Sequence, residues 1–321
     1  MLYKKLNHLN TNISKICLGG NIFGYLADQT QTIKLINQAG DNGINFIDTA
    51  DTYSEGISET YIGNALKKNR HKWIIASKCG LNSHQATNGL GSKHSIIQKL
   101  DGSLKRLKTD YIDIYQMHGF DKNTPLEETY STLSDCIKSG KIRSIGISNY
   151  STEQIIETTE CIKKNNFSPI VSAQCNFNLL NQNAIHNLFP TCNQHGISVL
   201  AYGVLARGIL GGAYGKNLPI PDDSRAKISD SIESDLTPEI LEIITKLKYQ
   251  SKKIGISLPI LSISWALSYS TLASAIIGIK NIKHLEGVVA AANKKIDTSI
   301  FTDLVKISSY SWNGKNLSMN A

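Results

Sequence analysis

The chain has 321 residues and a formal net charge of +8, with 41% hydrophobic and 19% charged residues. α/β barrels commonly hold about 250 residues or more around one core, so we predict a single domain over residues 1–321. No run approaches the ~20 apolar residues of a membrane helix, which argues against a membrane protein. The N-terminal MLYKKLNHLN lacks the apolar core of a signal peptide, and we expect a cytoplasmic protein.

The positive charge is scattered along the chain. The lysine pairs lie near the ends of different predicted helices, as at Lys67-Lys68 and Lys163-Lys164, and no basic run alternates with aromatic residues. This pattern predicts no binding to nucleic acid and only a mild attraction for an anionic small molecule. The six cysteines form no C-x-x-C pair, so we expect reduced thiols rather than disulfides or zinc ligands.

In chain order, the sequence first predicts a hairpin and then a regular alternation of strands and helices. The hairpin strands are expected at residues 2–6 and 13–17, and the first sheet strand ends at Gly19-Gly20. Helical patterns follow at about 30–41, 57–69, 93–107, 126–139, 152–163 and 183–195. The apolar runs between them end near Asp48, Lys78, His118, Ser148, Gln174 and Tyr202.

The C-terminal third departs from this rhythm. Residues 209–236 are rich in Gly, Pro, Asp and Ser and predict a functional loop over the sheet edge. Helices are then expected from Thr237, over 257–270 and over 300–307, with an eighth strand at 274–278. Strand-helix alternation indicates a parallel sheet, either doubly wound or closed into a barrel. Seven strands before the eighth favour the (β/α)8 barrel, with the hairpin outside it.

One ionisable residue ends each of three predicted strands, and a tyrosine follows the first of them. Asp48 closes NFID, Lys78 closes WIIASK and His118 closes YIDIYQMH, while Tyr53 lies on the loop after Asp48. A tyrosine has a reference pKa of about 10, so it can donate a proton near neutral pH only if a cation eases its ionisation. A carboxylate can hold that cation, and parallel strands would bring all four side chains to one barrel mouth.

At this point the chain resembles the aldo-keto reductase superfamily over nearly its whole length. The most specific stretches are GINFIDTADTYSEGISETYIG at 43–63, YIDIYQMHGFDKNTPLEETYSTLSDCIKSGKIRSIGISNY at 111–150, and AYGVLARGILGG at 201–212. The resemblance implies reduction of an aldehyde or ketone by a nicotinamide cofactor, reversibly and without a metal. Tyr53 would give the proton, Lys78 would lower the pKa of Tyr53, Asp48 would hold Lys78, and His118 would orient the carbonyl. The hairpin would close the bottom of the barrel.

The resemblance also implies a cofactor face. Ser148, Asn149 and Gln174 would hold the nicotinamide carboxamide, Tyr202 would stack on its ring, and a glycine-containing loop would carry the pyrophosphate. The remaining residues expected at the cofactor are Gly203, Leu205, Arg207, Gly208, Gly278, Lys280 and His284. His284 and Val288 depart from the residues that are common at their positions. Lys280 and Lys283 still favour NADP(H), with NAD(H) possible.

Two other functions are compatible with the same residues. One is a nucleotide-binding, redox-sensing partner subunit with little turnover, and the other is a keto-sugar reductase in a biosynthetic pathway. The expected partner is a small carbonyl compound, whose identity the sequence does not reveal, and the oligomeric state is open. We expect the substrate loops at 20–28, 80–91, 119–124, 213–231 and beyond 310. Their candidate aromatic wall residues are Phe23, Tyr25, Phe120, Tyr214 and Trp312.

Overall fold

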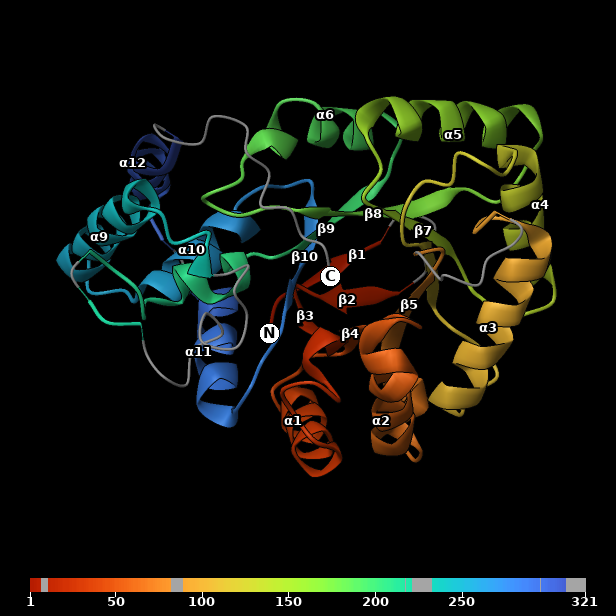
Figure 1. Cartoon of the computed structure of the whole chain (residues 1–321), viewed down its shortest axis with the longest axis horizontal. Helices are drawn as coiled ribbons and strands as arrows, with labels where there is room; N and C mark the ends of the chain where they lie inside the picture. The colour runs from red at the N-terminus through yellow and green to blue at the C-terminus, as the bar shows by residue number, and fades with distance from the viewer. Residues whose placement is uncertain (7–10, 82–88, 217, 221–232, 295, 310–321) are drawn as a thin grey trace.

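In the computed structural model, eight parallel strands close into a barrel ringed by helices (Figure 1). The structure describes residues 1–6, 11–81, 89–216, 218–220, 233–294 and 296–309. The strand order is β10-β3-β4-β5-β6-β7-β8-β9, so the (β/α)8 prediction is confirmed. The barrel strands are β3 (Ile16–Gly19), β4 (Phe46–Asp48), β5 (Ile74–Cys79), β6 (Ile114–Met117), β7 (Ile145–Ser148), β8 (Ile170–Asn176), β9 (Ser198–Tyr202) and β10 (Leu272–Ile277).

The helices fall close to the predicted ranges, except that α11 was not predicted and the helix expected at 183–195 is a 3-10 turn followed by the shorter α6. They are α1 (Gln29–Asp41), α2 (Ile57–Leu66), α3 (Lys93–Leu107), α4 (Leu126–Lys138), α5 (Thr152–Lys164), α6 (Leu188–Gln194), α9 (Pro238–Lys253), α10 (Leu258–Leu267), α11 (Ile282–Asn293) and α12 (Thr298–Ser309). Short 3-10 turns are η1 (Gly20–Ile22), η2 (Tyr53–Gly56), η3 (Arg70–Lys72), η4 (Asn183–Ile185) and η5 (Ala206–Gly211). Of the predicted loop at 209–236, residues 221–232 lie outside the described part.

Local capping explains where several helices begin. Asp28 accepts from the backbone of Gln31, whose side chain accepts from the backbone of Asp28, and this capping box starts α1. Thr237 caps α9 one residue before Pro238, a position where the missing N–H of proline costs nothing. At α4, Pro125 occupies the N-cap position without a side-chain cap, and the Thr124 hydroxyl instead donates to Asp121 at 2.6 Å.

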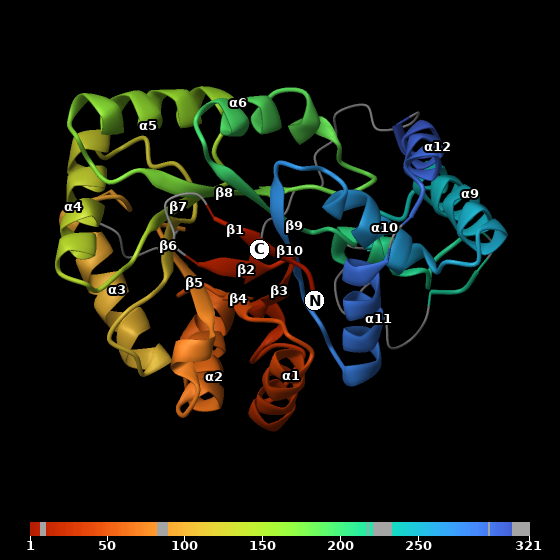
Figure 2. The ribbon, with the colours of Figure 1, turned by 180° about the vertical axis from the view of Figure 1, so that it is seen from behind.

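The N-terminal hairpin is present, but its second strand is shorter than predicted. β1 (Tyr3–Lys5) pairs antiparallel with β2 (Asn12–Ser14), while Ile16 and Cys17 already belong to the barrel strand β3. The turn at residues 7–10 lies outside the described part of the chain. Leu6 and Ile13 are fully buried in one cluster with residues of the barrel interior such as Phe46 and Leu200. The hairpin therefore closes the barrel at one end (Figure 2).

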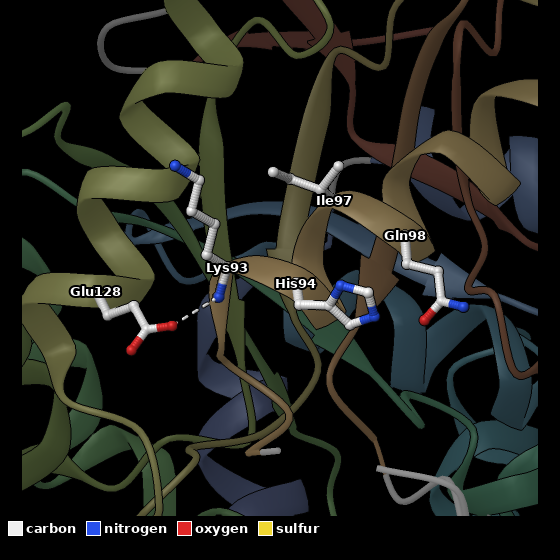
Figure 3. Close-up of a pocket in the computed structure, with 5 residues that line it drawn as sticks. All are labelled: Lys93, His94, Ile97, Gln98 and Glu128. Atoms are coloured by element: carbon white, nitrogen blue, oxygen red, sulfur yellow. Dashed lines mark hydrogen bonds between the residues drawn. The ribbon is translucent and has the colours of Figure 1, made fainter. Parts of the chain in front are cut away.

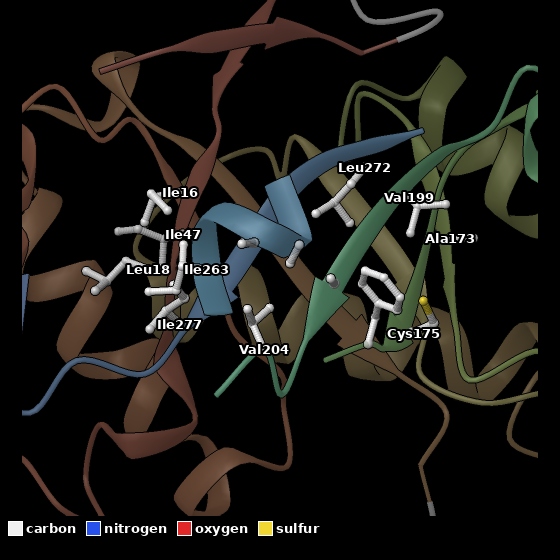
Figure 4. Packing of buried hydrophobic residues seen from close by; sticks show 14 of the residues in the cluster. Ile16, Leu18, Ile47, Ala173, Cys175, Val199, Val204, Ile263, Leu272 and Ile277 are labelled. Carbon is white, nitrogen blue, oxygen red and sulfur yellow. The ribbon is translucent and has the colours of Figure 1, made fainter. Parts of the chain in front are cut away.

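A larger apolar layer joins the barrel to the surrounding helices. Ile16, Leu18 and Ile277 lie beside Ile263 of α10 (Figure 4), and alternation along the parallel strands sends their neighbours inward. The inward face is apolar near the hairpin and polar toward the opposite mouth, where Asp48, Lys78, Gln116, Ser148 and Gln174 are all buried. Because buried polar groups need partners, this polar end marks the candidate site.

Candidate active site

Lys78 connects the predicted acid and carboxylate. Its side chain is fully buried, and Nζ donates to Asp48 Oδ2 at 2.5 Å, to Tyr53 Oη at 3.0 Å and to Thr49 O at 3.0 Å. Asp48 ends β4, and its register partner on β5 is Ala76, two residues before Lys78. The structure therefore brings Asp48, Tyr53 and Lys78 together as predicted. Burial alone would lower the pKa of Lys78, but Asp48 and Tyr53 raise it, so the amine stays cationic.

Tyr53 is half-buried at the start of η2. The two residues after it, Ser54 and Glu55, have φ values of 47° and 55°, a left-handed conformation that non-glycine residues rarely adopt. This tight turn directs the phenol toward the barrel axis, where Lys78 reaches it. Burial raises the pKa of Tyr53 above its ordinary value of 10.0, and Asp48 raises it further. Lys78 lowers this pKa, but its contribution is smaller than the increase from burial and Asp48 together. The net direction is thus opposite to the lowering expected from the sequence, and Tyr53 is protonated at neutral pH.

His118 follows β6 directly and lies beside the tyrosine. The ring centroids of His118 and Tyr53 are 5.9 Å apart at an interplanar angle of 77°. The His118 side chain is buried, and among the described residues Nδ1 has no hydrogen-bond partner. Burial, with a smaller contribution from Lys78, lowers its pKa to about 3. His118 is therefore a neutral imidazole at working pH, which can donate one N–H hydrogen bond but carries no exchangeable extra proton.

Asn149 and Tyr202 close one side of the mouth. Asn149 has a φ of 60°, and its amide donates to His118 O at 3.0 Å while it accepts from Tyr202 Oη at 2.7 Å. Both ends of this amide are therefore already used by protein groups. Ser148, one residue earlier, has a buried hydroxyl without a partner among the described residues. An unpaired buried hydroxyl at the mouth is available to a ligand.

Gln174 lies deeper than its expected role suggested. It is buried at the mouth end of β8, next to Ser148 in the β7–β8 register. Its Nε2 donates to Asp48 Oδ1 at 2.7 Å, so the amide nitrogen is bound to the Asp48 carboxylate. No hydrogen bond from the described residues reaches its Oε1. If Gln174 contacts the carboxamide of the nicotinamide, its Oε1 would therefore accept the hydrogen bond.

Two further residues of the site were not identified from the sequence. Gln116, in the middle of β6, is fully buried and donates to Asp48 Oδ1 at 3.2 Å. Asn178, also fully buried, donates to Gly203 O at 2.9 Å and fixes the start of the loop after β9. A glutamine inside the apolar run of β6 was the available signal, because a polar side chain in a buried strand needs a partner.

The loop after β9 contains several residues with positive φ. Gly203, Arg207 and Gly208 have φ values of 65°, 55° and 102°. At Gly208 a Cβ atom would meet nothing within 4 Å, so the backbone there borders open space. The guanidinium of Arg207 forms an ion pair with Asp235. Leu205, half-buried, packs against the core at the start of this loop.

The last group of predicted cofactor residues surrounds the start of α11. Gly278 follows β10, and Asn281 caps the helix by accepting from the backbone N–H of His284 at 2.9 Å. His284 is exposed in the first turn of α11, and Lys280 is half-buried just before the helix, so both side chains lie near its N-terminal end. Val288 is buried and packs into the core. Lys280 and His284 thus lie at the N-terminal end of α11, whereas Val288 lies in the core.

The expected aromatic wall is partly wrong. Phe23 is fully buried, and Tyr214 is 3% exposed, so neither lines an open mouth. Tyr25 is 56% exposed, and Phe120 packs edge-on against Tyr150 with ring centroids 5.2 Å apart. Trp312 lies outside the described residues. Tyr25 and Phe120 remain as the described aromatic candidates for substrate contact.

An open groove of about 580 Å³ lies outside the barrel. Lys93, His94, Ile97 and Gln98 of α3 and Glu128 of α4 line it (Figure 3). Its lining includes none of Asp48, Tyr53, Lys78 and His118, so the groove is separate from the candidate site. In the described part of the chain, no cluster of three or more His, Cys, Asp or Glu could hold a metal, and no helix is long and apolar enough to cross a membrane. The six cysteines are unpaired.

A parallel barrel whose mouth holds a tyrosine, a buried lysine, a carboxylate and a neutral histidine has the groups of an oxidoreductase that reduces carbonyl compounds. The model of the aldo/keto reductase family matches residues 15–309, and the chain therefore belongs to this family. It is an NAD(P)H-dependent oxidoreductase that acts on small carbonyl compounds.

Similar proteins of known sequence agree with this assignment. An uncharacterized oxidoreductase YrpG of Bacillus subtilis is 29% identical over 312 residues, which cover 94% of both chains. L-glyceraldehyde 3-phosphate reductase of Escherichia coli K12 is 31% identical over 84% of this chain and 81% of its own length. Versiconal hemiacetal acetate reductase of Aspergillus parasiticus is 28% identical over 92% of this chain and 94% of its own length.

Proposed function

We propose that the protein reduces a small aldehyde or ketone with NADPH, and that Tyr53 donates the proton. The observation that carries this proposal is the contact of Lys78 Nζ with both Tyr53 Oη and Asp48 Oδ2. The bound nicotinamide supplies the hydride to the carbonyl carbon. Tyr53 keeps its proton until the carbonyl oxygen gains negative charge, and the resulting tyrosinate lies beside the Lys78 cation. Asp48 holds that cation in place, since its carboxylate is buried with it.

His118 acts as a neutral hydrogen-bond donor in this proposal. A pKa of about 3 excludes the imidazolium as the acid near neutral pH, so its N–H only orients and polarises the carbonyl. Ser148 Oγ and Gln174 Oε1 are the groups open to the carboxamide, and Tyr202 supports the nicotinamide ring. Gly203, Leu205, Arg207 and Gly208 accommodate the pyrophosphate, while Gly278, Lys280 and His284 hold the adenosine end.

Turnover distinguishes this proposal from a redox-sensing binding subunit. Purified protein would be mixed with NADPH and a panel of aldehydes, ketones and quinones, and NADPH oxidation would be followed together with the affinity for NADPH. Oxidation that depends on one carbonyl class supports the proposal. Tight NADPH binding without oxidation in the presence of any carbonyl would contradict it.

The rate of carbonyl reduction should be nearly independent of pH between about 5 and 8. Over this range Tyr53 keeps its proton, because its pKa is raised above 10.0, and His118, with a pKa of about 3, stays neutral. Loss of kcat is expected only at alkaline pH, where Tyr53 ionises. A pH profile of kcat at saturating NADPH measures this. A rise or fall of kcat near pH 6 to 7 would instead indicate that an imidazole donates the proton.

The choice of NADPH over NADH is expected to depend on Lys280. Lys280→Ala should weaken NADPH binding by about tenfold and NADH binding by less than about twofold, since only NADPH carries the 2'-phosphate. Fluorescence titration of the free protein gives both Kd values. Lys294→Ala is the matched control, because Lys294 lies at the opposite end of α11. Equal weakening of both nucleotides would contradict a phosphate contact.

A further inference from the structure

The carboxylate of Asp48 is held from two sides. Oδ2 accepts from Lys78, while Oδ1 accepts from Gln174 Nε2 at 2.7 Å and from Gln116 Nε2 at 3.2 Å. Asp48 is 2% exposed, so little water supports it. Hydrogen bonds to a buried charge are stronger than neutral ones, and losing one leaves a polar atom without compensation.

The two glutamines are also joined to each other. Gln174 Nε2 lies 3.4 Å from Gln116 Oε1, so the Gln116 amide donates to Asp48 and accepts from Gln174. The neighbouring carboxylate sets this orientation, because the opposite flip would place a carbonyl oxygen against it. Asp48, Gln116 and Gln174 thus form a closed set in which each amide orients the other.

The barrel wall is built around the Gln116 side chain. Lys78 and Gln116 are register partners across β5 and β6, and Gln116 in turn pairs with Gly146 of β7. A Cβ atom at Gly146 would lie 2.7 Å from Gln116 Cγ, a distance that real Cβ contacts do not show. The glycine leaves room for the fully buried Gln116 side chain to extend toward Asp48.

We propose that Gln116 is a positioning residue for carbonyl reduction, which holds Asp48 and Gln174 so that Lys78 stays against Tyr53. This inference rests on the proposed function, because it concerns the same proton donor. Gln116 acts only through Asp48 and Gln174. Its loss should therefore reduce the rate of proton donation more than the binding of substrate or NADPH.

The first test is Gln116→Leu, which keeps the volume and removes the amide. We expect kcat to fall about tenfold or more, with KM for the carbonyl and Kd for NADPH changed by less than about twofold. Ser172→Ala is the matched control. Ser172 Oγ is buried in the same part of the barrel, near Gly146, and has no partner in the described part of the chain, so its removal should change kcat by less than about twofold.

The second test is Gln116→Glu, which is nearly isosteric and makes the effect depend on pH. Asp48, the carboxylate that Gln116 contacts, interacts electrostatically with Lys78 of β5, Cys17 of β3 and Tyr53 of η2, and His118 after β6 interacts with Lys78. Next to Asp48 the new carboxyl group should share a proton, so it still donates at about pH 6 and becomes a second carboxylate at alkaline pH. We expect kcat within a few-fold of the parent at about pH 6 and roughly tenfold lower by about pH 9.

The outcomes separate the inference from the proposed function. If the parent protein reduces no carbonyl, the proposed function fails. If the parent is active and Gln116→Leu keeps kcat within about twofold, Gln116 is not a positioning residue. The inference is equally contradicted if Ser172→Ala loses as much activity as Gln116→Leu, or if Gln116→Glu has the pH profile of the parent. Thermal unfolding of each variant shows that it is folded at the assay temperature.

Discussion

Replacing Tyr53 with phenylalanine should lower kcat by about 10² or more and leave NADPH affinity almost unchanged. The substitution removes one hydroxyl, which is 3.0 Å from Lys78 Nζ, and keeps the ring that lies edge-on to His118. The developing alkoxide then has no hydroxyl acid at hand, because His118 is neutral with a pKa of about 3 and the Lys78 ammonium is held by Asp48 and Thr49. Steady-state kinetics with NADPH oxidation, together with fluorescence titration of NADPH, would measure the two effects.

Tyr61→Phe is a suitable control for this substitution. Tyr61 lies on α2, eight residues further along the chain than Tyr53. The substitution Tyr61→Phe removes the same kind of hydroxyl at a position outside the candidate site. It should keep kcat within about twofold of the parent. If Tyr53→Phe also kept most of the rate, Tyr53 would not be the acid, and the proton would have to come from Lys78 or from bound water.

The strand-end residues could be predicted because the relevant physics is local. An apolar run that ends in one ionisable residue predicts a buried strand. In a parallel barrel, that residue then lies at the mouth, as Asp48, Lys78 and His118 do. Loop aromatics carry no such information. Phe23 and Tyr214 turn into the core, and only the packing around them decides this.

The direction of the Tyr53 pKa also could not be obtained from the sequence. The neighbouring Lys78 lowers it, as residue types suggest, but burial raises it by more, and burial depends on the folded mouth. The link from Gln174 to Asp48 was missed for a related reason. A strand-end amide can point along the barrel axis or up to a ligand, and the distance to Asp48 is set by barrel closure.

The second large effect is expected for Lys78→Met, which should lower kcat by about 10² or more as well. Tyr53 would then form a tyrosinate without a cation beside it. The substitution also leaves Asp48 buried without its charge partner, which typically costs about 3–5 kcal/mol of stability. Kinetics below the unfolding temperature, with Lys78→Met combined with Asp48→Asn as a control, separate lost stability from lost chemistry.

The double variant Tyr53→Phe with Lys78→Met decides whether Lys78 acts through the tyrosine. Lys78 Nζ contacts Tyr53 Oη, Asp48 Oδ2 and Thr49 O, so Tyr53 is its one contact that can give a proton to the substrate. Once the hydroxyl is gone, the lysine has no ionisation left to assist, and the double variant should lose little more kcat than either single variant. Losses that multiply would show that Lys78 stabilises the transition state independently, for instance by direct attraction of the carbonyl oxygen. A double-mutant cycle on kcat at fixed pH and saturating NADPH gives this coupling directly.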